Sequence, residues 1–200
     1  SRAVQGTGAA PATLSISDGP TYNYGTVANG SSNDKSFTLT NSGGVSAVSI
    51  SGSGLAAPFT FKGGTYPGTG GTCSSTLSAS GTCTIVVNYS PTTNTTHNAT
   101  MSVSYNDGVT GQSTSRDVQG TAVAPALITV SDGPTYNFGS VANGSSNDKT
   151  LTLTNSGTFG ASSMTGNGLS APYTFKGGAY PGSGGTCSTT LAASATCTIV

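Results

Sequence analysis

The sequence repeats itself at an offset of 114 residues. Residues 17–23 recur as residues 131–137, and the correspondence holds without a gap between residues 1–86 and 115–200. Of these 86 aligned positions, 61 are identical. A unit of 114 residues is as long as a whole domain and much longer than one coil of a solenoid. The sequence therefore predicts a tandem array of one domain type.

The phase of the repeat predicts the domain boundaries. We expect residues 1–10 to be the closing strand of a preceding repeat and residues 11–124 to be one complete repeat. Residues 125–200 then form a second repeat that is truncated before its last strands. This phase is typical of a segment of a longer tandem array. As an alternative, residues 1–10 of a neighbouring molecule could complete the truncated repeat by strand donation, although they supply only 10 of the 38 missing residues.

Apolar and polar residues alternate within the unit, which is typical of strands with one buried face. Residues 13–17 place Leu14 and Ile16 on one face and hydroxyls on the other. The same alternation predicts strands at 22–24, 35–41, 47–50, 59–61, 83–89, 101–105 and 112–121. Gly, Pro, Asn and Asp mark turns between them, and no stretch has helical periodicity. We therefore expect an all-β fold of tandem immunoglobulin-like β-sandwich domains.

The chain carries very little charge. It has 6 basic and 6 acidic side chains, a formal net charge of zero, and 65 Ser and Thr residues. A neutral surface has no electrostatic attraction for nucleic acid or anionic membranes, and no apolar run is long enough to span a bilayer. We therefore expect no nucleic-acid partner and no membrane insertion in this segment. Few charges protect the edge strands, which favours association with other copies of the chain.

The four cysteines form one pair in each repeat. Cys73 and Cys83 are separated by nine residues, and Cys187 and Cys197 have the same spacing. An even count with one pair in each unit predicts a disulfide within each domain. Because disulfides persist in oxidising compartments, the pairs also indicate an exported protein.

Several short motifs resemble those of a known domain family. Residues 138–144 (FGSVANG) and 37–43 (FTLTNSG) are similar to the opening strands of ASH-type (abnormal-spindle/Hydin-like) immunoglobulin-like domains. Residues 83–91 (CTIVVNYSP) and 118–121 (VQGT) resemble strands of bacterial "choice-of-anchor D" surface proteins. The resemblance implies a repetitive exported bacterial protein with tandem Ig-like domains and no catalytic residues.

The residues themselves offer no catalytic or metal-binding constellation. His97 is the one histidine and lies in a polar stretch that we expect to be an exposed loop. The sequence has no G-x-S-x-G motif that would supply a nucleophilic serine for this histidine to activate. Two G-x-G-x-x-A motifs are followed at once by Pro58 and Pro172, which prevents the helix that dinucleotide binding requires. We therefore expect no enzyme activity, no cofactor and no metal site. A single calcium ion at a turn or at a junction between units stays an open alternative.

Tyrosine is the one residue type that suggests a ligand surface. Four tyrosines are candidates for ligand-facing aromatics: Tyr22, Tyr66, Tyr136 and Tyr180. Tyrosines in a sandwich more commonly fill the core or cover its rim, and this alternative applies to each of them.

These observations favour a non-enzymatic structural protein at the bacterial cell surface, in which tandem Ig-like repeats form a stalk, fibre or filament. Its expected partners are the neighbouring repeats and other copies of the chain, with a cell-surface or glycan ligand as a further candidate. One alternative is an adhesive or carbohydrate-binding module of a surface adhesin, and another is an accessory domain of an exported enzyme.

Overall fold

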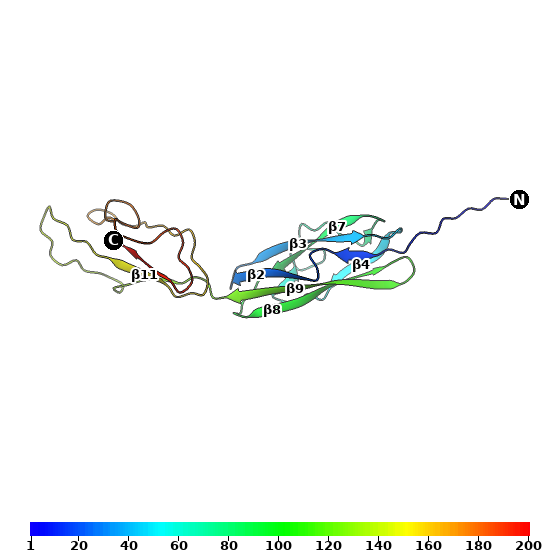
Figure 1. Ribbon diagram of the computed structural model, residues 1–200, viewed down its shortest axis with the longest axis horizontal. Coiled ribbons are helices and arrows are strands. Elements are labelled where there is room, and N and C mark those ends of the chain that lie inside the picture. Colours follow the sequence, from blue (N-terminus) through cyan, green and yellow to red (C-terminus); the bar gives the residue numbers. More distant parts are fainter. The chain divides into compact units, whose positions relative to one another are not determined.

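The computed structural model describes the whole chain, Ser1–Val200, and its regular elements are all strands. The chain divides into two compact units, Ser1–Val123 (unit 1) and Ala124–Val200 (unit 2). Figure 1 shows the strands of each unit along the sequence. No element is a helix that is long and apolar enough to cross a membrane. The expectation of an all-β fold is confirmed.

The first sheet of unit 1 contains four antiparallel strands in the order β1-β3-β7-β5. Their bounds are β1 Leu14–Ile16, β3 Asn33–Asn41, β7 Thr82–Tyr89 and β5 Phe59–Phe61. The central pair is β3 and β7, with Leu39 opposite Cys83 and Phe37 opposite Ile85. These are the alternating segments in which the apolar side chains occupy every second position, so one face of the sheet is continuously apolar.

The second sheet of unit 1 contains five strands in the order β2-β9-β8-β4-β6. Their bounds are β2 Thr21–Ala28, β9 Gly111–Val123, β8 Thr96–Asn106, β4 Ala47–Ser53 and β6 Thr76–Leu77. Strands β8 and β9 form a long antiparallel hairpin across the turn at Asp107, whereas β2 pairs with β9 in parallel. Parallel neighbours need a long connection, and here it spans most of unit 1. Strand β2 lies at the edge of the sheet, so β9, the last strand of the unit, is its one partner.

The inner faces of the two sheets share one core. Phe37, Phe59 and Ile85 come from the first sheet, and Met101 and Val103 come from the second; all five are fully buried. Phe59 stacks on the Tyr89 ring at a centroid distance of 4.5 Å. Outward positions on the same strands carry Ser, Thr and Asn. Unit 1 is therefore a closed Ig-like β-sandwich whose polar faces account for the Ser- and Thr-rich composition.

A fully buried asparagine joins three loops of unit 1. The Oδ1 atom of Asn41 accepts hydrogen bonds from the backbone N–H groups of Thr13 and Gly43. Its Nδ2 atom donates to the carbonyls of Val45, Leu77 and Ser78. Asn155 makes the same five bonds at the matching positions of unit 2. The asparagine thus satisfies backbone groups that would otherwise be buried without partners.

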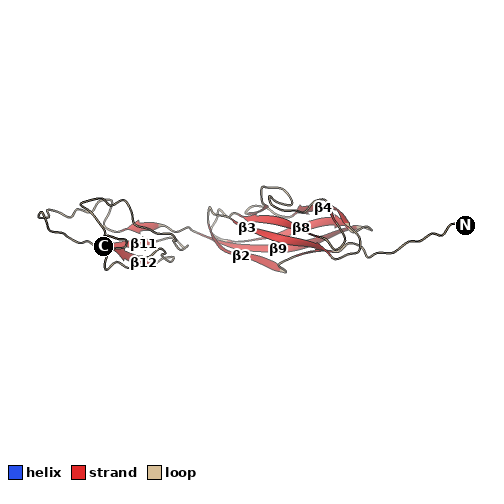
Figure 2. Ribbon diagram, turned by 90° about the horizontal axis from the view of Figure 1, so that it is seen from above, coloured by secondary structure: helices blue, strands red, loops and turns tan.

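Unit 2 contains a single three-stranded sheet in the order β10-β11-β12. Its strands are β10 Ile128–Val130, β11 Leu151–Asn155 and β12 Thr196–Ile199. They match parts of β1, β3 and β7, because residues 125–200 repeat residues 11–86. The 200 residues hold no counterparts of β8 and β9 for unit 2, and residues 135–142, which match β2, form no strand. Figure 2 shows the long loops of unit 2.

Candidate functional site

Each unit contains its own disulfide. Cys73 is bonded to Cys83 in unit 1, and Cys187 is bonded to Cys197 in unit 2. All four side chains are buried, and no cysteine is free. Each bridge ties a Gly-rich loop to a core strand, since Cys83 lies in β7 and Cys197 lies in β12. The two bridges are consistent with an oxidising, exported environment.

The candidate tyrosines of unit 1 lie against the core. Tyr22 meets the rings of Tyr24 and Phe37 edge-on at 5.0 and 5.5 Å. Tyr66 meets Phe61 edge-on at 5.6 Å, and its buried hydroxyl has no hydrogen-bond partner. Burial raises the pKa of Tyr66 to about 12. Tyr22 and Tyr66 therefore do not form a common exposed surface for a ligand.

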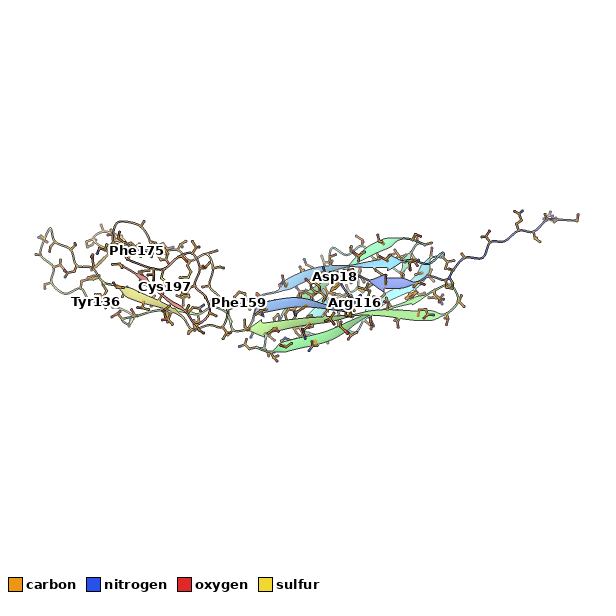
Figure 3. The ribbon with its side chains drawn as sticks, in the orientation of Figure 1. Asp18, Arg116, Tyr136, Phe159, Phe175 and Cys197 are labelled. Carbon is orange, nitrogen blue, oxygen red and sulfur yellow. A yellow bond between two sulfur atoms is a disulfide. The ribbon has the colours of Figure 1, made fainter.

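The candidate tyrosines of unit 2 differ from each other. Tyr180 packs edge-on against Phe175 at 5.6 Å and contacts the small core of unit 2. Tyr136 is exposed, and the Lys149 ammonium lies 4.5 Å from its ring centroid. Figure 3 shows Tyr136 and Phe175 within unit 2. A ligand-facing role for Tyr136 stays a prediction.

The expectation that His97 lies in an exposed loop is wrong. His97 is part of β8 and is half-buried. Its Nδ1 atom lies 2.9 Å from the Tyr89 hydroxyl, and its Nε2 atom lies 3.1 Å from the Thr93 hydroxyl. This part of β8 was not predicted because most of its residues are polar. Its inward-facing positions alternate with Thr and Asn. His97 thus holds the hydroxyl of a buried core tyrosine.

Sequence reasoning did not identify Arg116, which fastens β9 to the turn before β2. The guanidinium donates hydrogen bonds to the carbonyls of Ser17 and Pro20 at 2.8 and 2.9 Å, and also to that of Ile16. The one signal in the sequence is that Arg116 has a counterpart, Arg2, in the repeat. Arg116 also lies beside Asp18 (Figure 3) and contributes to lowering the pKa of that carboxyl.

A carboxylate–lysine pair recurs at this turn in both units. Lys35 Nζ lies 2.8 Å from Asp18 Oδ1, and Lys149 Nζ lies 2.8 Å from Asp132 Oδ1. The hydrogen bond from the lysine is the main reason that the pKa of each Asp carboxyl lies below its ordinary value. No three His, Cys or Asp side chains gather anywhere in the chain.

Unit 2 has an open apolar groove on the inner face of its sheet. The groove has a volume of about 340 Å³ and is lined by Val130, Tyr136, Leu151, Leu153, Tyr173 and Phe175, among others. Lys149 is the one charged residue in its lining. The matching face of unit 1 is covered by Met101, Val103 and Val118 from β8 and β9. The groove thus lies at the positions where β8 and β9 complete the core in unit 1.

A family model described as "HYDIN/CFA65/VesB-like, Ig-like domain" matches residues 12–121. Among solved structures, the ASH/PapD-like domain 7 of human CEP192 is 17% identical, with 62% of this chain and 96% of that chain covered and a TM-score of 0.45. The Vibrio cholerae VesB protease is 18% identical, with 54% of this chain and 31% of that chain covered and a TM-score of 0.45. A comparison with curated proteins finds no match.

Proposed function

Since the chain belongs to the HYDIN/CFA65/VesB-like Ig-like domain family, we propose that it is a non-enzymatic structural protein in which tandem Ig-like units form a stalk, fibre or filament at the bacterial cell surface. One observation carries this proposal. The sequence of one Ig-like unit recurs after 114 residues with 61 of 86 aligned positions identical. Repetition of one rigid unit builds length, which is what a spacer or shaft needs.

The residues that both units share support a mechanical role. Each unit has a disulfide between a loop and a core strand, and each has a buried asparagine that makes five hydrogen bonds. These groups hold loops to strands and lie inside the fold, where they cannot meet a substrate. The polar outer faces carry mostly uncharged Ser, Thr and Asn with few charged residues, which suits side-by-side packing of neighbouring shafts.

Export is testable through the cysteines. We expect peptide mapping of the protein from its source cells, with thiols blocked at lysis, to recover Cys73 linked to Cys83 and Cys187 linked to Cys197. Because cytosolic thiols are kept reduced, the recovery of four blocked free thiols would place the protein in the cytosol and contradict a cell-surface role.

The alternative function is an adhesive or glycan-binding module, and the exposed Tyr136 ring favours it. An exposed aromatic ring offers an apolar face against which the apolar face of a sugar ring can stack. Glycan-array binding by the 200-residue chain separates the two functions. A structural spacer shows no saturable binding. Binding that is lost in Tyr136→Ala and kept in Val109→Ala, a control at an exposed turn of unit 1, would overturn the structural proposal.

A further inference from the structure

Strand β7 of unit 1 has one edge that no strand covers along its whole length. Strand β3 pairs along one side of β7, and on the other side β5 pairs only with residues 87–89. The rest of that edge belongs to residues 82–86 (TCTIV), which carry no charge and no proline. Uncharged strand edges pair readily with other chains, and native proteins cover or interrupt them. Here a Gly-rich segment covers the edge: residues 62–73, which we call the edge loop.

The edge loop occupies the free main-chain groups of β7. The N–H group of Lys62 donates to the carbonyl of Val86 at 2.9 Å, and the N–H group of Val86 donates to the carbonyl of Pro67 at 2.8 Å. The N–H group of Thr72 donates to the carbonyl of Thr84 at 3.0 Å. In return, the N–H group of Thr84 donates to the Thr72 hydroxyl at 2.9 Å. If the loop moved away, two N–H groups and two carbonyls of β7 would lose their partners.

The closed position of the edge loop is costly. Five of its twelve residues are glycine, and glycine loses more conformational entropy on ordering than any other residue. Gly68 has a φ of 90°, and a Cβ atom there would collide with the carbonyl of Val86. The Tyr66 hydroxyl is buried without a hydrogen-bond partner, which adds an unfavourable desolvation cost. These costs favour an open loop unless a further bond holds it on β7.

The disulfide of unit 1 is that bond. Cys73 is the last residue of the edge loop and is bonded to Cys83 in β7, with 4.8 Å between their Cα atoms. The other end of the loop is fixed because Phe61 pairs with Val87 as part of β5. Attachment at both ends keeps the loop beside β7 and removes much of the entropy that it would gain by leaving.

We propose that the Cys73–Cys83 disulfide is a redox switch that closes the edge of β7 to a second copy of this chain. In the dithiol state the edge loop leaves β7, and residues 82–86 of two copies pair as antiparallel strands about Thr84. Oxidation by a disulfide-bearing oxidant prevents this pairing. The two thiols lose two protons and two electrons and form the S–S bond, while the disulfide of the oxidant is reduced to two thiols.

The exposed edge is complementary to itself, which is why a second copy fits it. With Thr84 of the two copies opposite each other, Thr82 of one copy lies opposite Val86 of the other. The main-chain groups that the edge loop leaves then pair across the contact. Residues 82–86 bring no like charges together, and β5 keeps its place because it pairs only with residues 87–89. Main-chain pairing of this kind supplies the affinity of strand addition.

This inference goes beyond the proposed structural role, because it gives the disulfide control over one contact between copies of the chain. The oxidised chain keeps this edge closed, so the contacts of a stalk or filament are made through other surfaces.

Sedimentation velocity of the full chain over a wide concentration range tests the switch. Replacing Cys73 and Cys83 together by Ala removes the bond and leaves the disulfide of unit 2 in place. We expect self-association to become about tenfold stronger or more than that of the unmodified chain. Val103→Ala is the matched control, because it truncates a fully buried side chain of β8 and leaves the disulfide intact. Association of this control should stay within about twofold of the unmodified chain.

Charges at the centre of the proposed pair test its register. In the chain without Cys73 and Cys83, Thr84→Lys places two like charges opposite each other and should return association to the level of the unmodified chain. Thr84→Asp should do the same. An equal mixture of these two variants should associate again, because opposite charges then meet across the contact.

Hydrogen exchange locates the contact. The amides of Thr84 and Val86 should exchange faster in the dilute double-Cys variant than in the unmodified chain, and they should become protected again as the variant associates. Association without this protection would overturn the proposal. Unchanged association of the double-Cys variant, an equal increase in Val103→Ala, or a mixture that associates no better than its components would overturn it as well.

Circular dichroism of the double-Cys variant completes the test. Loss of the sheets of unit 1 would contradict the proposal, because the bridge would then hold the whole unit and not the edge loop. All of these outcomes leave the proposed structural role intact, since free thiols in the protein from its source cells contradict that role and association of the variants does not.

Discussion

Units 1 and 2 share most side chains at their aligned positions, yet unit 1 has nine strands in two sheets and unit 2 has three strands in one. The clearest case is β2. Residues 135–142 are identical to β2 at six of eight positions and form no strand. The strand β2 pairs with β9, and unit 2 has no β9 counterpart among its residues. Strand formation at this position is therefore determined by the partner and not by the local sequence.

Other features are the same in both units because their partners are nearby in the sequence. Asn155 reproduces the hydrogen bonds of Asn41, and the second disulfide reproduces the first. The β10-β11-β12 sheet forms because each of its strands has its neighbour within residues 125–200. In unit 2, the disulfide, the hydrogen bonds of the buried asparagine and the counterpart of the first sheet thus form without a second sheet.

The largest difference between the units is expected at a core aromatic. Phe59→Ala removes a fully buried ring that stacks on Tyr89, and it should lower the free energy of unfolding of unit 1 by about 3–5 kcal/mol. Tyr173→Ala changes the matching exposed ring of unit 2 and should cost at most about 0.5 kcal/mol. Urea denaturation followed by circular dichroism measures both. Equal costs would show that unit 2 buries this position.

The buried asparagine should matter in both units. Asn41→Ala leaves five backbone groups without partners, so we expect unit 1 to lose about 3 kcal/mol or more of stability. Asn88→Ala, which removes an exposed bond to Asp34, is the matched control and should cost far less. Chemical denaturation of each variant measures the loss. A cost for Asn41→Ala no larger than that of the control would contradict a structural role for this residue.

Much of unit 1 was predictable because its strands carry local signals. Alternation in residues 35–41 and 83–89 predicts β3 and β7, and the Asn106–Gly108 turn predicts the β8–β9 hairpin. The parallel pairing of β2 with β9 and the bonds of Arg116 could not be predicted, because they join residues about a hundred positions apart with no local pattern. The open inner face of unit 2 follows from the phase of the repeat, since residues 125–200 correspond to residues 11–86, which precede β8 and β9.

The disulfides should contribute less than the core aromatic. Replacing Cys73 and Cys83 together by Ala should cost about 2–3 kcal/mol, because the bridge closes a short loop with a sequence separation of 10. We expect unit 1 to stay folded, since its core is closed by two sheets. The same double replacement at Cys187 and Cys197 should unfold unit 2, whose core consists of few residues. Proteolysis of each variant distinguishes the units, and equal resistance would contradict this difference.

The smallest effect concerns the turn between β8 and β9. Backbone N–H groups of Thr110 and Val109 donate to the Asp107 carboxylate and hold its pKa below the ordinary value. Its contribution to stability is therefore present above the unfolded-state pKa and is lost as the pH falls through the lower folded-state pKa. Asp107→Asn should be less stable than the unmodified chain at neutral pH. The difference in melting temperature should shrink below about pH 4, and a constant difference would contradict this origin.

Amide hydrogen exchange of the dilute, monomeric chain tests the central claim most directly, because it compares two nearly identical segments in one sample. If partners determine strand formation, the amides of β2 (Thr21–Ala28) exchange slowly while those of residues 135–142 exchange rapidly. Equal protection of the two segments in the monomer would contradict the claim and show that the local sequence is sufficient to form the strand.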